Sequence, residues 1–349
     1  MAAFNPRESE NGAQDKSPPV IFVHPEPDEP ATNPRAGDTP DQVQALKKIV
    51  DLNGYAFRND DEEKVYQVNF NGADLTGTNL QCLRAFPNLT ILSINESTLA
   101  DDDLSVVRSL PKLQSLGLNY SPHIGDRALK HLEHHPGIVS LSLARTSVTD
   151  AGMKSVATLP NLASLQLTNT GITNVGLKLL VRMNKLDEIS LMGTRVDDEG
   201  LRLFRNHRTL RVINLNNTVI TDAAIEVLAT LPTLEHLHLS STHITDRAVE
   251  ALSGAKKLKA IGLRNTRVKN TAVAHLTQLK KLRYIDLIGT QIDDGCLEDL
   301  EQLNGFFTTL WFNHTGVTPE GKERLRAKYD AKLQLRLKSG KPFLDDENE

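Results

Sequence analysis

Two histidines, His236 and His238, are separated by one residue, a spacing that places both imidazoles on one face of a β-strand. Paired imidazoles of this kind can bind zinc when a carboxylate or a thiolate completes the site. The candidate carboxylate, Asp286, is expected two strands away, roughly 10 Å at the usual strand spacing. We therefore expect no metal and no cofactor, and we interpret both histidines as residues that bind a partner.

Recognisable catalytic motifs do not occur in the chain. The sequence has no glycine-rich phosphate loop after a strand, no G-x-S-x-G and no H-E-x-x-H. Its two cysteines, Cys82 and Cys296, are more than 200 positions apart, which suggests neither a disulfide framework nor a paired metal site. The sequence therefore predicts a protein that is not an enzyme.

Residue types that anchor protein interfaces gather in the C-terminal half of the chain, at positions predicted to point away from the core. We expect them to form a concave partner-binding surface, and Trp311, the single tryptophan, to be exposed there. The predicted surface consists of Glu188, Asn214, His236, His238, Arg264, Tyr284, Asp286 and Trp311.

A strongly basic segment, Ala251 to Ile285, contains nine Lys and Arg residues and no acidic residue. Its two lysine pairs occupy equivalent repeat positions and should stack on one rim, whereas Arg267 and Lys269 lie beyond the opposite end of the strand. Such a patch accelerates the encounter with an acidic protein partner. We call the following residues the basic rim: Lys256, Lys257, Arg267, Lys269, Lys280 and Lys281.

A repeat of 24 residues positions all these side chains. The first half of each unit reads L-x-x-L-x-L and predicts a short strand with one buried face, and the second half has helical spacing. Ten to eleven such units predict an α/β, right-handed solenoid with a parallel β-sheet inside and helices outside. The units begin at Val65, Leu89, Leu113, Ile138, Leu162, Leu186, Leu210, Leu234, Leu258, Leu282 and Phe307.

Two polar columns accompany the repeat, and we interpret both as structural. Small hydroxyl residues, from Ser97 to Thr315, are expected to satisfy backbone groups in a buried turn. Asp or Asn residues, from Asp126 to Asp294, precede each helical segment and are expected to be helix N-caps. Neither column is therefore predicted to supply catalytic groups.

The consensus L-x-x-L-x-L-x-x-T-x-[IV]-T-D-x-[GA]-[LV] resembles the leucine-rich repeat family over residues 65 to 318. The segment Thr149-Asp150-Ala-Gly152-Met153 resembles the cysteine-containing subclass found in F-box ubiquitin-ligase adaptors, with Thr in place of the subclass cysteine, as in similar bacterial proteins. The resemblance implies a binding surface without specifying a partner.

The segments that flank the repeats differ in composition. Residues 1–40 hold half of the sixteen prolines with seven acidic and three basic residues, which predicts a disordered tail. Within it, the apolar stretch Val20–Val23 is either a chance cluster or a docking motif. We expect a helix and a hairpin over 41–64, the repeats over 65–318, a capping helix over 319–338, and a mobile acidic tail over 339–349.

These features predict a non-catalytic interaction module that binds a protein partner through its C-terminal repeats. The alternatives are a substrate-recognition adaptor of a ubiquitin-ligase-like complex, or an exported effector. A formal net charge of −4 does not favour nucleic acid, and no apolar run or basic-apolar leader predicts membrane insertion or secretion. We therefore expect a cytoplasmic monomer.

Overall fold

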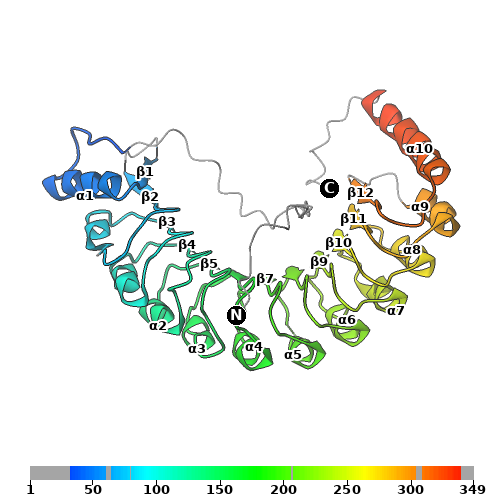
Figure 1. Cartoon of the computed structure of the whole chain (residues 1–349), viewed down its shortest axis with the longest axis horizontal. Coiled ribbons are helices and arrows are strands. Elements are labelled where there is room, and N and C mark those ends of the chain that lie inside the picture. The colour runs from blue at the N-terminus through cyan, green and yellow to red at the C-terminus, as the bar shows by residue number, and fades with distance from the viewer. Residues whose placement is uncertain (1–31, 60–63, 79, 206, 304–308, 339–349) are drawn as a thin grey trace, which may run out of the picture.

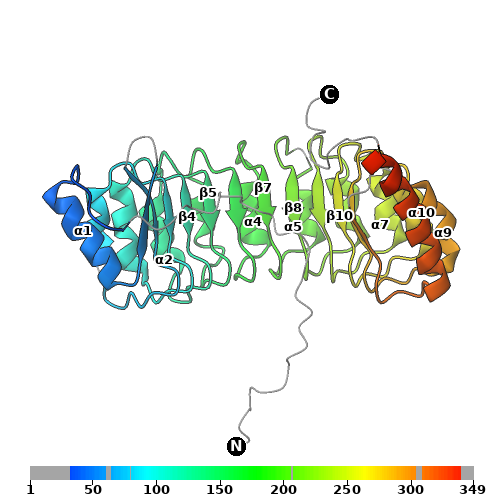
Figure 2. The same cartoon turned by 90° about the horizontal axis from the view of Figure 1, so that it is seen from above.

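The computed structural model describes residues 32–338 except 60–63, 79, 206 and 304–308, with side chains described up to residue 328. Of the predicted tails, 1–40 and 339–349, residues 1–31, including Val20–Val23, and 339–349 lie outside the described residues, whereas residues 32–40 are described and Pro40 begins the first helix. The described chain forms one arc with strands on its inner side and helices on its outer side (Figure 1). Seen from above, α1 and α10 lie at its two ends (Figure 2).

One sheet runs along the inside of the arc, and its twelve strands among the described residues follow the order of the sequence. β1 is antiparallel to β2, and every later pair is parallel. The strands are β1 Tyr55–Arg58, β2 Val65–Asn69, β3 Ile91–Ser93, β4 Ser115–Gly117, β5 Ser140–Ser142, β6 Ser164–Gln166, β7 Glu188–Ser190, β8 Val212–Asn214, β9 His236–His238, β10 Ala260–Gly262, β11 Tyr284–Asp286 and β12 Thr309–Trp311. The predicted solenoid with a parallel inner sheet is confirmed.

Short helices form the outer layer. The first repeats use 3₁₀ helices, such as Leu80–Ala85 and Asp101–Ser109, where α-helices were expected. The α-helices are α1 Pro40–Asp51, α2 Asp126–Leu129, α3 Met153–Val156, α4 Asn174–Leu180, α5 Asp198–Arg202, α6 Asp222–Leu228, α7 Asp246–Ala251, α8 Asn270–Leu276, α9 Leu297–Gln302 and α10 Pro319–Lys338.

A continuous leucine-rich core lies between the two layers. Equivalent leucines of successive repeats stack on one another in this core. Leu191, Leu215 and Leu239, for example, are each fully buried. The middle residues of the strands lie in register, for example Ile213 beside Leu237. No single unit encloses a core, so each repeat is stabilised by burying apolar surface against its neighbours.

The hydroxyl column is structural, as the sequence predicts. Thr146, Thr218 and Thr290 are buried, and each Oγ1 donates a hydrogen bond to a carbonyl three residues earlier, at 2.6 to 2.7 Å. Each such bond satisfies a backbone acceptor in the turn that follows the strand.

The assignment of the Asp and Asn column to helix N-caps is wrong. The N-cap of α6 is Thr221 and that of α7 is Thr245, one residue before the column. The Asp222 carboxylate instead bonds to the following repeat, accepting from the Thr245 N–H at 2.8 Å and from its hydroxyl at 2.5 Å. The column therefore links repeats, because the next loop stacks within reach of each carboxylate.

Each end of the array is closed by different means. At the N-terminal end, Thr39 and Gln42 form a capping box on α1, and the buried Asp38 and Arg58 pair at 2.6 Å to join its start to β1. At the C-terminal end, α10 buries Leu325 against the last repeat. The apolar and aromatic residues that follow Leu325 at intervals of four, Tyr329, Leu333 and Leu337, lie beyond the described side chains.

Candidate partner-binding surface

Four neighbouring strands, β9 to β12, bring most of the predicted binding residues together. Their parallel register places His236 level with Ala260, Tyr284 and Thr309, and His238 level with Gly262, Asp286 and Trp311. β10 contributes only the small residues Ala260 and Gly262 to this face, and both are buried. Glu188 and Asn214 lie on β7 and β8, farther along the same sheet.

An ion pair lies at the centre of this surface. Arg264, two residues after β10, donates from Nε and Nη2 to Oδ2 of Asp286, each at 3.0 Å. Asp286 is fully buried and His238 is 4% exposed. The expectation that both side chains are open to solvent on the concave face is therefore wrong. Neighbouring side chains cover them, which an in-or-out strand pattern does not reveal.

Two aromatic rings extend the cluster toward the last strand. The rings of Tyr284 and Trp311 pack edge to face, with centroids 5.1 Å apart and planes at 79°. Trp311 is half-buried rather than exposed as expected, because the neighbouring ring covers part of it. Such aromatic pairs present a rigid apolar surface with a polar edge, a combination common in protein interfaces.

A ladder of alternating charges borders the strands, and sequence reasoning missed it. Arg211 pairs with Asp187 at 2.9 Å and with Glu235 at 3.1 Å, and Glu235 also pairs with Lys259 at 3.2 Å. The signal was available, since Asp187, Arg211, Glu235 and Lys259 are spaced by 24 residues. These ion pairs orient side chains at the edge of the concave face.

The two remaining predicted residues, Glu188 and Asn214, differ in their surroundings. Burial, together with the Asp187 charge, raises the pKa of Glu188, although Arg211 lies 3.7 Å away. Asn214 is half-buried and accepts a hydrogen bond from the Asn216 N–H at 3.0 Å, which holds its side chain against its own strand. Neither residue contacts the Arg264 cluster through an ion pair or hydrogen bond within the described part of the chain.

Burial lowers the pKa of His236, which therefore favours the neutral imidazole. Burial also raises the pKa of the Cys296 thiol to about 11, so this thiol stays protonated.

Among the residues that the structure describes, no three His, Cys, Asp or Glu side chains are grouped as metal ligands.

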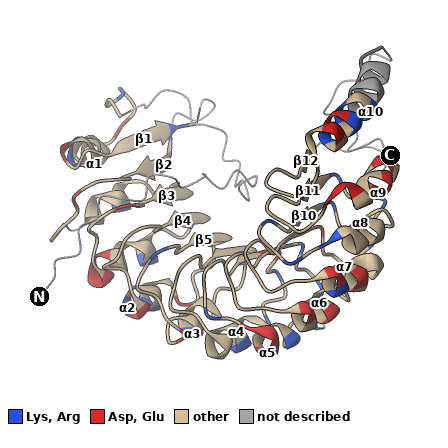
Figure 3. Ribbon diagram, turned by 45° about the vertical axis from the view of Figure 1, so that its right-hand side comes forward, with Lys and Arg blue, Asp and Glu red and all other residues tan. Residues whose placement is uncertain are grey.

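The basic rim is exposed at all six positions. One lysine of each pair bonds to a carbonyl near a helix end: Lys256 Nζ to Ser253 O at 2.6 Å, and Lys280 Nζ to Thr277 O at 3.0 Å. The other two, Lys257 and Lys281, form no hydrogen bond or ion pair within the described ranges. Elsewhere, acidic and basic residues are intermixed over the outer helices (Figure 3).

Comparisons with known proteins agree with this architecture. The family model described as "Leucine Rich repeat" matches residues 230–253. An internalin (InlF) from Listeria monocytogenes is similar in structure, with 24% identity, a TM-score of 0.56, and coverage of 72% of this chain and 68% of the internalin. No curated protein sequence matched. The chain therefore has the leucine-rich-repeat fold.

Two further solved structures are less similar. Internalin C2 from the same bacterium has 20% identity and a TM-score of 0.46, over 63% of this chain and 84% of that one. A plant peptide hormone receptor, RGFR1 in complex with RGF2, has 12% identity and a TM-score of 0.44, over 83% and 44%. Separately, no helix in the described ranges is both long and apolar enough to cross a membrane.

Proposed function

We propose that this leucine-rich-repeat solenoid is a non-catalytic interaction module that binds a protein partner through the concave face of β9 to β12. The observation that carries the proposal is the juxtaposition of the Arg264–Asp286 ion pair with the Tyr284–Trp311 ring pair on adjacent strands. Arginine and large aromatic residues contribute most of the binding free energy in many protein interfaces.

Preorganisation is the proposed mechanism. The sheet and the paired contacts hold Arg264, Tyr284 and Trp311 in defined positions before any partner arrives. Less side-chain entropy is then lost on binding, so more of the contact free energy appears as affinity.

The basic rim favours an acidic partner. The exposed ammonium groups of Lys257 and Lys281, which have no partner among the described residues, attract carboxylates over a distance that shortens as salt is added. Charge reversal there should mainly slow association, whereas loss of a ring contact should mainly speed dissociation.

A two-stage experiment tests the proposal. The full chain first captures partners from native lysate at low salt, and each purified candidate is then titrated against wild type, Trp311→Ala and the double variant Lys257→Glu/Lys281→Glu. We expect each change to raise Kd by about tenfold or more, which corresponds to about 1.4 kcal/mol.

The matched control is Lys47→Glu/Lys48→Glu, which makes the same charge change on the exposed face of α1. This variant should bind like wild type, and all four proteins should have similar melting temperatures. Equal Kd values for wild type and both test variants would place the partner site elsewhere and overturn the proposal.

A further inference from the structure

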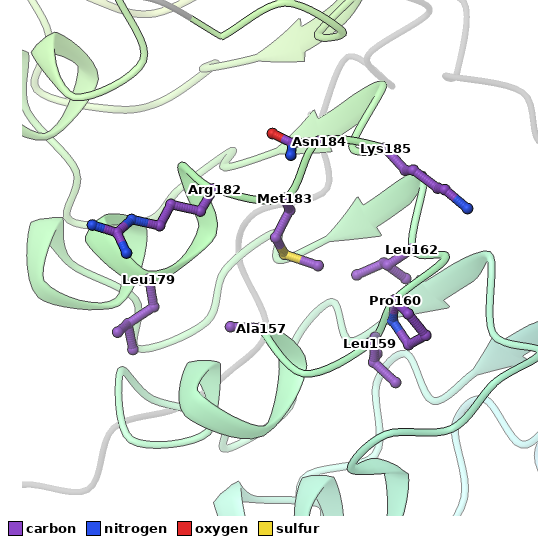
Figure 4. Close-up of a pocket in the computed structure, with 9 residues that line it drawn as sticks. All are labelled: Ala157, Leu159, Pro160, Leu162, Leu179, Arg182, Met183, Asn184 and Lys185. Carbon is purple, nitrogen blue, oxygen red and sulfur yellow. The ribbon is translucent and has the colours of Figure 1, made fainter.

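A hollow of about 350 Å³ opens between the loops that follow α3 and α4 (Figure 4). Leu159, Leu162, Leu179 and Met183 supply its apolar lining, and the exposed Ala157 lies at its mouth. In Figure 4 the Met183 side chain points into the space between the two loops. The hollow is large enough to accept one large apolar side chain.

Cationic groups surround this hollow. Arg182 and Lys185 line it and extend to opposite sides in Figure 4. The next repeat adds the exposed Arg205 and Arg208 at the same edge of the solenoid. Lys185 bonds to Asn161, whereas the guanidinium groups of Arg182, Arg205 and Arg208 form no ion pair within the described residues.

Of the acidic groups of this region, Glu133 accepts a hydrogen bond from Ser155 Oγ and has no ion pair among the described residues, whereas two others are paired. Asp187 pairs with Arg211, and Glu199 pairs with Arg202 at 2.6 Å. The ends of α4 and α5 also lie here, and cations near a helix C-terminus interact favourably with its dipole. That interaction accounts for a preference for positive charge, but not for an apolar hollow beside three unpaired guanidinium groups.

We propose that the hollow binds an extended acidic segment of another protein, with one large apolar side chain of that segment inserted between the two loops. The carboxylates on either side of this anchor pair with Arg182, Arg205 and Arg208. The hollow is lined by the loops that lead from α3 and α4 to the next strands, whereas the proposed concave surface is formed by β9 to β12 on the inner side of the arc (Figure 1). The basic rim also attracts acidic segments, so the preference for an apolar anchor and its loss on filling the hollow are what distinguish this site from the concave surface.

Labelled twelve-residue peptides provide the probe. One consists of alternating Glu and Asp with a single central Phe, and the other carries Ser in place of Phe. Fluorescence anisotropy with the full chain should show the Phe peptide binding about tenfold more tightly. The double variant Arg182→Glu/Arg205→Glu should weaken both peptides by about tenfold or more, whereas Arg267→Glu on the opposite rim should change either Kd by less than about twofold.

Filling the hollow tests the apolar contact. Ala157→Trp should remove the preference for Phe and leave binding of the Ser peptide unchanged, because the new ring occupies the mouth. Its control is Ala229→Trp, which changes the equivalent residue three repeats along. Since Ala157 is exposed, the variant should keep the wild-type melting temperature.

Two results would overturn the proposal. The first is equal affinity for the Phe and Ser peptides, which would show that nothing enters the hollow. The second is binding of an oligothymidine as tight as that of the Phe peptide and insensitive to Ala157→Trp, which would show a general polyanion surface.

Discussion

At the scale of single residues, burial separates the polar side chains of the concave face into two kinds. Asp286 is fully buried, and its carboxylate accepts from the Arg264 guanidinium at Oδ2 and from the Ile288 N–H at Oδ1. Lys257 and Lys281 remain in water and keep their charges available. The buried polar side chains maintain the shape of the concave surface, and the exposed lysines can contact a partner.

Histidine titration gives a prediction at this scale. Burial lowers the pKa of His236 in the folded protein, as it does for His135 and His207. The unfolded chain then binds these protons more tightly, so stability is present at pH 7 and lost as pH falls below about 6.5. We expect the free energy of unfolding, measured in urea at pH 7, 6 and 5, to decrease over that range.

The variant His236→Gln should show a smaller decrease, because one of the four described histidines whose pKa burial lowers no longer titrates; the other three are His131, His135 and His207. Replacing the exposed Gln278 with Asn, which changes no titratable group, is the control and should leave the pH dependence unchanged. An identical decrease in wild type and His236→Gln would contradict the contribution of His236.

At the scale of elements, the column of Asp and Asn residues determines how one helical segment is attached to the next. Asp150, Asp198 and Asp222 each face a threonine in the following repeat and accept from its N–H and its hydroxyl. Asn174 faces Asp197 instead, accepting from its N–H and donating from Nδ2 to its carboxylate. Where the column residue is Asn rather than Asp, the facing residue of the next repeat is therefore Asp rather than Thr, and each hydrogen bond keeps one donor and one acceptor.

This pairing predicts a rescue by double substitution. Thr245→Asp alone should destabilise the protein. The new carboxylate at position 245 would face the Asp222 carboxylate with no hydroxyl to donate a hydrogen bond between them. Adding Asp222→Asn reproduces the Asn174–Asp197 pair and should recover most of the loss, which we expect to be about 1.5–3 kcal/mol. Urea unfolding of the wild type, both single variants and the double variant measures the coupling.

The control is Glu226→Ala, which removes only an exposed ion pair with Arg247 and should cost less than about 0.5 kcal/mol. Additive effects of the two single substitutions would show that the column and the following residue act separately.

At the scale of the whole molecule, stability is transmitted from neighbour to neighbour along the arc. The core is one continuous cluster, and its two ends are closed by α1 and α10 (Figure 1). A solenoid of this kind can lose structure locally while distant repeats stay folded.

A cavity in the middle of the array tests this behaviour. Leu215 is fully buried, so Leu215→Ala should destabilise the protein by about 2–5 kcal/mol. Hydrogen exchange should show the largest loss of protection in β7 to β9 and a smaller loss in β3 and β4. The control Leu203→Ala, at an exposed leucine, should change little, and a uniform loss over all strands would indicate all-or-none unfolding instead.

The repeat, the inner sheet, the buried leucine column and the buried hydroxyl column could all be predicted from the amino-acid sequence. The reason is that each depends on a local pattern that recurs every 24 residues. The same pattern indicated which residues share the concave face, since strand register follows from the period.

The contacts between neighbouring repeats follow from the three-dimensional packing. It buried Asp286 and His238, covered part of Trp311, and directed the Asp222 carboxylate to the next loop rather than to its own helix. It also opened the hollow beside Arg182. Each of these outcomes depends on distances between side chains about 24 positions apart, and a pattern within one repeat carries no information about those distances.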